Sequence, residues 1–229
     1  MKKTPDPQPL WSLLEGMAVE LPHTQDKVVE LLGAIKRLPN PIRNGEEYKI
    51  SSEKVFSDLG YFETNIADYS RGMLSSSYFL QVSNLLTGLG ETLRSPDSSE
   101  CSSKWARINA FAACLTTSLV KDLRHRALET DEDTLNHNYL EERCIREFFL
   151  PAAANQIIYG AYPLWSIRAD DKAPEWTYWR TKLGDLSVSD EVSAETNSLL
   201  RQAVQTMDEV VEDPEKGNWA GKLAELSST

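Results

Sequence analysis

The sequence predicts an all-α fold, and three observations support this prediction. Apolar residues recur three and four positions apart along most of the chain, which is the spacing of helices with one buried face. Strand-like alternation is confined to Tyr78, Leu80 and Val82. The length of 229 residues suits one domain. We therefore expect a single compact domain of about seven to nine helices, in a bundle or a stack of helix pairs. It should span residues 9–213, between a flexible N-terminus (1–8) and a loosely structured C-terminal tail (214–229).

Two apolar stripes predict the first two helices. They consist of Leu10, Leu13, Leu14 and Met17 in the first helix, and of Val28, Leu31, Leu32, Ile35 and Leu38 in the second. The first helix follows Pro9, Thr24 is a candidate N-cap of the second, and Pro39 ends it. Residues 40–52 predict a loop, because they are mostly polar and include Pro and Gly.

Further stripes predict helices over residues 55–69, with a break at Gly60, and over residues 74–89. Ser51 or Ser52 is the expected cap of the first of these. Residues 94–103 are the most polar, Ser-rich stretch and predict a loop within the domain. The clearest helix should then start at Ser102 or Ser103. Its stripe consists of Trp105, Ile108, Phe111, Ala112, Leu115, Leu119 and Leu123.

Three helices are expected in the C-terminal part. The acidic residues 130–134 should form a loop before a helix that starts near residues 136–138 and ends at Pro163. Pro151 removes one backbone hydrogen bond inside this helix, so it should kink it. Pro174 has a favourable first-turn position in the next helix. Ser189 is the expected cap of the last long helix.

The composition excludes several classes of function. With 24 Lys and Arg against 35 Asp and Glu, the net charge is −11. This balance argues against a nucleic-acid partner, because phosphate binding needs an excess of basic residues. No apolar run is long enough for a membrane span, and no secretory signal is visible. Three cysteines without a CxxC pair predict reduced thiols, so we expect a cytoplasmic protein.

Five motifs follow one another in a recognisable order. They are Pro9-Leu10-Trp11, KVVELL at 27–32, KWARINAFAA at 104–113, FLPAAANQII at 149–158, and Trp176-x-x-Trp179 before a helix that ends in Met207. Together they resemble a fungal family filed as domain of unknown function 3632, over most of the chain. The resemblance implies a helical fold, a fungal intracellular origin and, for some members, a place among genes of specialised metabolism. It implies no catalytic residues.

Acidic clusters raise the hypothesis of prenyl-diphosphate chemistry on Mg²⁺. Residues 170–175 read DDKAPE, and Asp131–Asp133 form a second cluster. Magnesium needs carboxylates that face one another across a cavity, whereas Pro174 interrupts the first cluster and the second falls in a predicted loop. The three histidines are far apart in sequence. We therefore expect solvated acids, no metal and no cofactor.

The most informative cluster is aromatic. Its members are Tyr159, Tyr162, Trp165, Trp176, Tyr178 and Trp179. They are expected either to pack in the core, where indoles bury large areas, or to line a pocket or an interface. In the pocket interpretation the candidate ligand-binding residues are Trp165, Arg168, Trp176, Trp179, Arg180 and Asn155.

Two hypotheses of function follow. An interaction scaffold or regulatory module needs an exposed apolar or acidic groove for a protein partner. A small-molecule-binding accessory protein, or an enzyme of fungal specialised metabolism, needs an enclosed cavity for a small apolar metabolite at the aromatic cluster. The sequence carries no GxSxG, P-loop or GxGxxG motif, so it assigns no catalytic residue. We favour the first hypothesis because it requires less, and leave the oligomeric state open.

Overall fold

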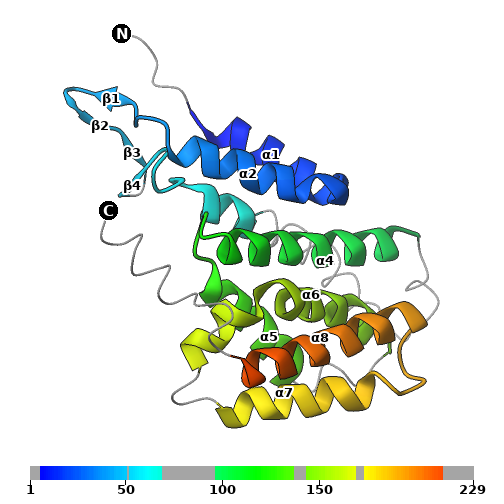
Figure 1. The fold of residues 1–229 in the computed structure, drawn as a ribbon. Coiled ribbons are helices and arrows are strands. Elements are labelled where there is room, and N and C mark those ends of the chain that lie inside the picture. Colours follow the sequence, from blue (N-terminus) through cyan, green and yellow to red (C-terminus); the bar gives the residue numbers. More distant parts are fainter. Residues whose placement is uncertain (1–5, 51, 69–95, 137–142, 169–172, 214–229) are drawn as a thin grey trace. The chain divides into compact units, whose positions relative to one another are not determined.

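Helices dominate the computed structural model, which describes residues 6–50, 52–68, 96–136, 143–168 and 173–213 (Figure 1). Seven α-helices have defined bounds within these residues, and the strands there are only two residues long. The all-α prediction is therefore confirmed. The chain divides into two compact units, Met1–Leu93 (unit one) and Arg94–Thr229 (unit two). Residues 96–103 are helical, so this part of the stretch 94–103 is not the loop that we expected. The limits of the helical domain at residues 9 and 213 stay a prediction.

Unit one begins with a pair of helices that pack on each other. The elements are α1 (Gln8–Glu20), the short 3₁₀ helix η1 (Pro22–Thr24) and α2 (Gln25–Lys36). Thr24 precedes α2 as predicted, but its side chain caps nothing in α2. Its Oγ1 instead donates to the carbonyl of Leu21 at 2.7 Å, which secures the connection between the two helices.

The predicted loop at 40–52 contains strands. The strands are β1 (Ile42–Arg43), β2 (Glu46–Glu47), β3 (Lys49–Ile50) and β4 (Glu53–Lys54), and they form two antiparallel hairpins. The first turn is Asn44-Gly45, with φ of 56° and 86°. Asn-Gly with both residues at positive φ is the favoured two-residue hairpin turn, so this dipeptide was the signal for a hairpin.

The helix predicted over 55–69 starts later than expected. Turns occupy most of residues 55–61, and the described helical residues are 62–68. Gly60 sits at the boundary, as predicted. A Cβ on Gly60 would lie 3.0 Å from the carbonyl oxygens of Glu53 and Lys54, so only glycine fits against this hairpin. The helix predicted over 74–89 lies outside the described residues.

Unit two begins with α4 (Pro96–Thr117), which includes most of the stretch predicted as a loop. Pro96 starts the helix, where proline is well tolerated. Ser102 is therefore inside the helix and not its cap, and its hydroxyl donates to the carbonyl of Glu147 at 2.8 Å. The predicted stripe from Trp105 to Leu115 is buried. The helix ends before Leu119, which has a φ of 57°.

The acidic residues 130–134 are also helical, contrary to prediction. They belong to α5 (Arg124–Asn136), and Asp131 is fully buried. The long α6 (Arg143–Arg168) follows and runs through both Pro151 and Pro163, so Pro163 does not end it. The kink at Pro151 stays a prediction. Figure 1 shows α6 between α4 and α8, in line with its extensive contacts to both.

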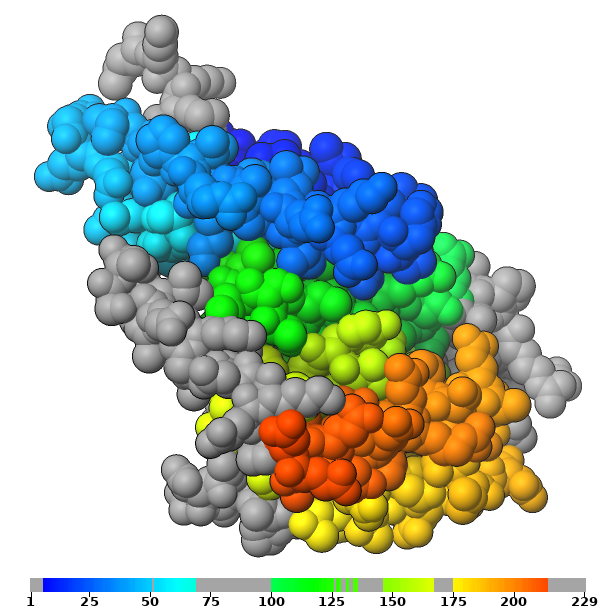
Figure 2. Space-filling view, in the orientation of Figure 1, coloured from blue at the N-terminus to red at the C-terminus, as the bar shows by residue number. Residues whose placement is uncertain are grey.

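The last two described helices are α7 (Ala173–Leu186) and α8 (Ala194–Glu212). They lie side by side on one face of unit two (Figure 2). Pro174 lies in the first turn of α7, as predicted. The cap of α8 is Ser193, whose Oγ accepts from the Thr196 amide, and not Ser189. A cluster of buried apolar side chains from α5, α6, α7 and α8 forms the core of this part of unit two. The predicted tail, residues 214–229, lies outside the described residues.

Candidate functional site

The aromatic cluster is divided between the core and the surface of unit two. Trp176 and Trp179 on α7 are buried members of the hydrophobic core. Trp165 on α6 packs against this core, edge-to-face with Trp176 at a centroid distance of 5.4 Å. Tyr159 and Tyr178 are about half exposed. The tryptophans therefore join α6 to α7 by apolar contact.

The polar residues predicted to bind a ligand form hydrogen bonds with neighbouring helices. Arg180 on α7 is exposed, and its guanidinium donates two hydrogen bonds to the carboxylate of Asp208 on α8. This pairing raises the pKa of Arg180 and lowers the pKa of Asp208. The side chain of Asn155 donates to the carbonyl of Ala106 on α4 at 3.3 Å. The side chain of Arg168 lies outside the described residues. Arg180 and Asn155 thus face different helices, and not a shared centre with the tryptophans.

Three polar atoms in this part of unit two are buried and have no hydrogen-bond partner among the described residues. They are Thr134 Oγ1 of α5, Tyr162 Oη of α6 and Trp176 Nε1 of α7. Native interiors satisfy most such groups with protein or water, and each one left unsatisfied costs about 1–3 kcal/mol. Each of α5, α6 and α7 therefore carries unused hydrogen-bonding capacity in the interior of unit two.

Unit one holds a strongly perturbed acid. Glu15 on α1 is 0% exposed. Its Oε2 accepts a hydrogen bond from Asn65 Nδ2 at 2.7 Å, while Oε1 has no partner among the described residues. Asn65 Nδ2 also donates to Ser12 Oγ at 3.1 Å. Desolvation raises the pKa of Glu15 to about 8, although the Asn65 hydrogen bond lowers it; Asp68 adds a smaller repulsion. The carboxyl group is therefore mostly protonated at neutral pH.

Apolar contacts of α1 hold this acid in place. Trp11, one turn before Glu15 on the same helix face, is fully buried. Its indole N–H donates to the carbonyl of Gly60 at 3.1 Å, and its ring packs edge-to-face on Phe62 at 5.6 Å. The sequence signal for the buried acid was this spacing of four from Trp11. It was missed because the predicted stripe was centred on Leu10, Leu13 and Met17 instead.

Three members of the predicted stripe, Leu10, Leu13 and Met17, lie on the surface of α1, which corrects our expectation, while the fourth, Leu14, is buried. We name Leu10, Leu13, Met17 and Leu21 the α1 flank. Their exposed fractions are 38%, 59%, 37% and 44%. The inner face of α1 consists of Trp11, Leu14, Glu15, Ala18 and Val19. The helix is thus apolar on two sides. Glu15 is the one charged residue among the buried positions of α1.

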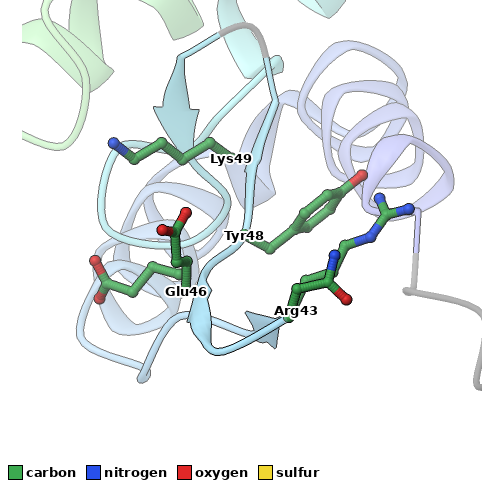
Figure 3. Close-up of a pocket in the computed structure, with 6 residues that line it drawn as sticks. Arg43, Glu46, Tyr48 and Lys49 are labelled. Atoms are coloured by element: carbon green, nitrogen blue, oxygen red, sulfur yellow. The ribbon is translucent and has the colours of Figure 1, made fainter.

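A surface pocket of about 500 Å³ lies at the first hairpin and is lined by residues 43–49 except Gly45. Figure 3 shows Arg43 beside the ring of Tyr48, with Glu46 and Lys49 pointing to the other side of the strand. The Arg43 guanidinium lies 5.5 Å from the centre of that ring. Glu47 is paired with Lys54 at 2.7 Å, and this hydrogen bond lowers the pKa of Glu47. The mixed charges of this open pocket favour no single ligand class.

The described residues contain neither a group of metal ligands nor a membrane-spanning helix. Within the described ranges, no three His, Cys, Asp or Glu side chains are grouped as metal ligands would be. No helix in the described part of the chain has the length and apolar character needed to cross a bilayer. Of the sequence DDKAPE, residues 170–172 lie outside the described residues.

Fold and site together define a helical protein with two compact units, a buried acid in one and a tryptophan-rich core in the other. Residues 11–218 match the family described as a protein of unknown function, DUF3632. The chain belongs to this family, and the match covers the greater part of both units. Neither a curated protein nor a solved structure gives a significant match.

Proposed function

We propose that this protein is an interaction module, and that the α1 flank binds a helix of a protein partner. One observation carries the proposal: three large apolar side chains along one side of α1 and a fourth at its C-cap, Leu21, are exposed at spacings of three, four and four. Single exposed apolar residues are common on protein surfaces, but a continuous apolar line is typical of interaction sites. A cytoplasmic location in a fungus, as the family resemblance implies, is part of the proposal.

The chemistry of the flank indicates the kind of partner. Side chains at this helical spacing interdigitate with those of a second helix. The chain has a net charge of −11, which attracts a basic partner and accelerates its encounter. The occupant we propose is therefore an amphipathic helix with an apolar face and basic side chains beside it.

A photo-crosslinking amino acid at position 13 tests this proposal, because Leu13 has the largest exposed fraction of the flank. We expect crosslinks to one partner protein, within a helical peptide of the predicted character. The double variant Leu13→Glu/Met17→Glu should abolish capture of that protein by the full chain. Val188→Glu is the matched control, since Val188 is an exposed apolar residue of unit two. Equal capture by both variants would show that the α1 flank is not the docking surface.

The unsatisfied polar atoms in unit two favour a second candidate function, the binding of a small apolar metabolite. Such a ligand would lie among Trp165, Trp176 and Tyr162, with one polar group bonded to Trp176 Nε1 or Thr134 Oγ1. Native mass spectrometry of protein purified from its source tests this idea. A retained small molecule that is lost in Trp176→Phe supports it, and an adduct-free spectrum of the wild type contradicts it.

A further inference from the structure

The buried acid and the α1 flank belong to opposite sides of one helix. Glu15 is two residues from Leu13 and two from Met17, and two positions on an α-helix are about 160° apart. The inner side of this helix of 13 residues is buried, so the position of the flank depends on the packing of that side. Any change that weakens the contacts of Glu15 therefore alters the position of the α1 flank, although the flank residues themselves are unchanged.

We infer that Glu15 is a proton-controlled latch for α1: the neutral carboxyl holds the helix against residues 62–68, and loss of the proton releases it. This inference rests on the proposed docking function of the α1 flank, and it adds the regulation of that surface. Binding of the partner then requires the protonated latch.

The surroundings of Glu15 explain why the neutral form is needed. Asn65 supplies a single hydrogen bond to the carboxyl group. From the same helical segment, Asp68 adds negative charge nearby. On α1 itself, Ser12 is already engaged by Asn65. The buried side chains of α2 are Val28, Val29, Leu32 and Ile35, which offer no donor. Buried carboxylates are stable when they accept several hydrogen bonds or face a cation.

Ionisation therefore leaves a charge with one donor and mainly apolar side chains around it among the described residues. Water can hydrate this charge only if α1 moves away from Asn65. The movement also breaks the indole hydrogen bond from Trp11 to Gly60, which is one turn away on the same face. Proton loss at one buried atom is in this way coupled to the position of the whole helix.

Trp11 is a direct reporter for this coupling. Among the six tryptophans, each labelled with ¹⁹F, the Trp11 resonance is assigned by its absence in Trp11→Phe. We expect it to shift between pH 6 and pH 10 with a midpoint near pH 8. The shift should be absent in Glu15→Gln, which keeps the shape and the acceptor oxygen. Glu20→Gln is the matched control, since it removes an exposed acid of the same helix, and it should titrate like the wild type.

A second variant tests the direction in which the titration midpoint moves. Asn65→Leu removes the hydrogen bond that lowers the pKa of Glu15, so the midpoint should move upward. Hydrogen exchange measures the release of α1. The amides of α1 should lose about tenfold protection from pH 6.5 to pH 9 after correction for intrinsic rates, while those of α8 keep theirs. A pH-independent Trp11 resonance, or equal titration in Glu15→Gln, would overturn the inference.

The docking and latch proposals fail in different ways. If Trp11 titrates but flank variants capture the same partner as the wild type, docking on α1 is wrong. If capture needs the flank but is equal at pH 6.5 and pH 9, the latch is wrong and docking stands. If capture needs the flank and falls at pH 9 in the wild type but not in Glu15→Gln, both are supported.

Discussion

Each unit contains a glutamate away from bulk solvent, and the two have opposite surroundings. Glu147 on α6 accepts hydrogen bonds from the Ser193 amide, from Ser193 Oγ at 3.0 Å and from Thr196 Oγ1 at 2.7 Å. These donors belong to the start of α8, where the helix dipole also favours negative charge. Glu15 accepts one hydrogen bond from the part of unit one that the structure describes. The number of donors, and not burial alone, thus decides whether a carboxylate is accommodated.

Because of this difference, the two glutamates contribute differently to the stability of the units that contain them. Glu147 connects α6 to the beginning of α8 through these hydrogen bonds and strengthens unit two. Ionisation of Glu15 would oppose the packing of α1 and weaken unit one.

The largest expected effect is the pH dependence caused by Glu15. Its pKa is about 8 in the folded protein against an ordinary value of 4.5. Between these values the unfolded chain releases the proton while the folded chain keeps it, so the free energy of unfolding falls as pH rises, and levels off above pH 8. Each pH unit is worth ~1.4 kcal/mol, so the loss is about 5 kcal/mol at most.

Urea unfolding of Glu15→Gln and the wild type at pH 4.5, 7 and 9 measures this loss. The variant should match the wild type at pH 4.5 and be several kcal/mol more stable at pH 9 (about 5 at most). The comparison of the two glutamates breaks down if the difference between the curves does not grow with pH. The other acids of the chain contribute equally to both proteins and cancel.

The next largest expected effect is the difference in stability between substitutions on the two sides of α1. Leu14 is 2% exposed and its neighbour Leu13 is 59% exposed. Leu14→Ala should lower the free energy of unfolding by about 3 kcal/mol, as expected for a buried leucine. Leu13→Ala should lower it by about 0.5 kcal/mol or less. The pair is its own control, and a larger loss for Leu13→Ala would mean that the α1 flank is covered by other parts of the protein.

The same two sides show what could be predicted from the sequence. Periodicity gave the existence of α1 but not its orientation, because Leu10 and Met17 fit a stripe as well as Trp11 and Ala18 do. In α8, Leu200, Ala203, Met207 and Val210 lie on one buried side, together with Thr196. Orientation is thus readable only when a helix has a single apolar side.

Local polarity misled the prediction elsewhere. Residues 96–103 and 130–134 look like loops, yet both are helical because their helices bury apolar residues further along, such as Phe111 in α4 and Leu135 in α5. Tertiary packing outweighs weak local propensity. The helix cap was placed at Ser189 because several serines compete near α8. Only Ser193 lies within reach of both Glu147 and the Thr196 amide, a fact of tertiary structure.

The smallest expected effect tests the well-satisfied glutamate. Glu147→Ala leaves three donors at the start of α8 without their acceptor, and the partial exposure of this site allows water to replace some of the bonds. We therefore expect a loss of about 2 kcal/mol in urea unfolding at pH 7. Glu147→Gln keeps an acceptor oxygen and should recover about half of it. Ser193→Ala should cost about 1 kcal/mol, as other N-cap losses do.

A double variant distinguishes the stabilisation by the Glu147 carboxylate from the stabilisation by the Ser193 cap. If Glu147 acts through the donors of α8, the loss in Glu147→Ala/Ser193→Ala should be smaller than the combined losses of the single variants by at least about 0.5 kcal/mol. Additive losses would show that Glu147 stabilises unit two through other contacts. In that case the contrast with Glu15 would rest on burial alone, and the number of hydrogen-bond donors around each carboxyl group would not explain it.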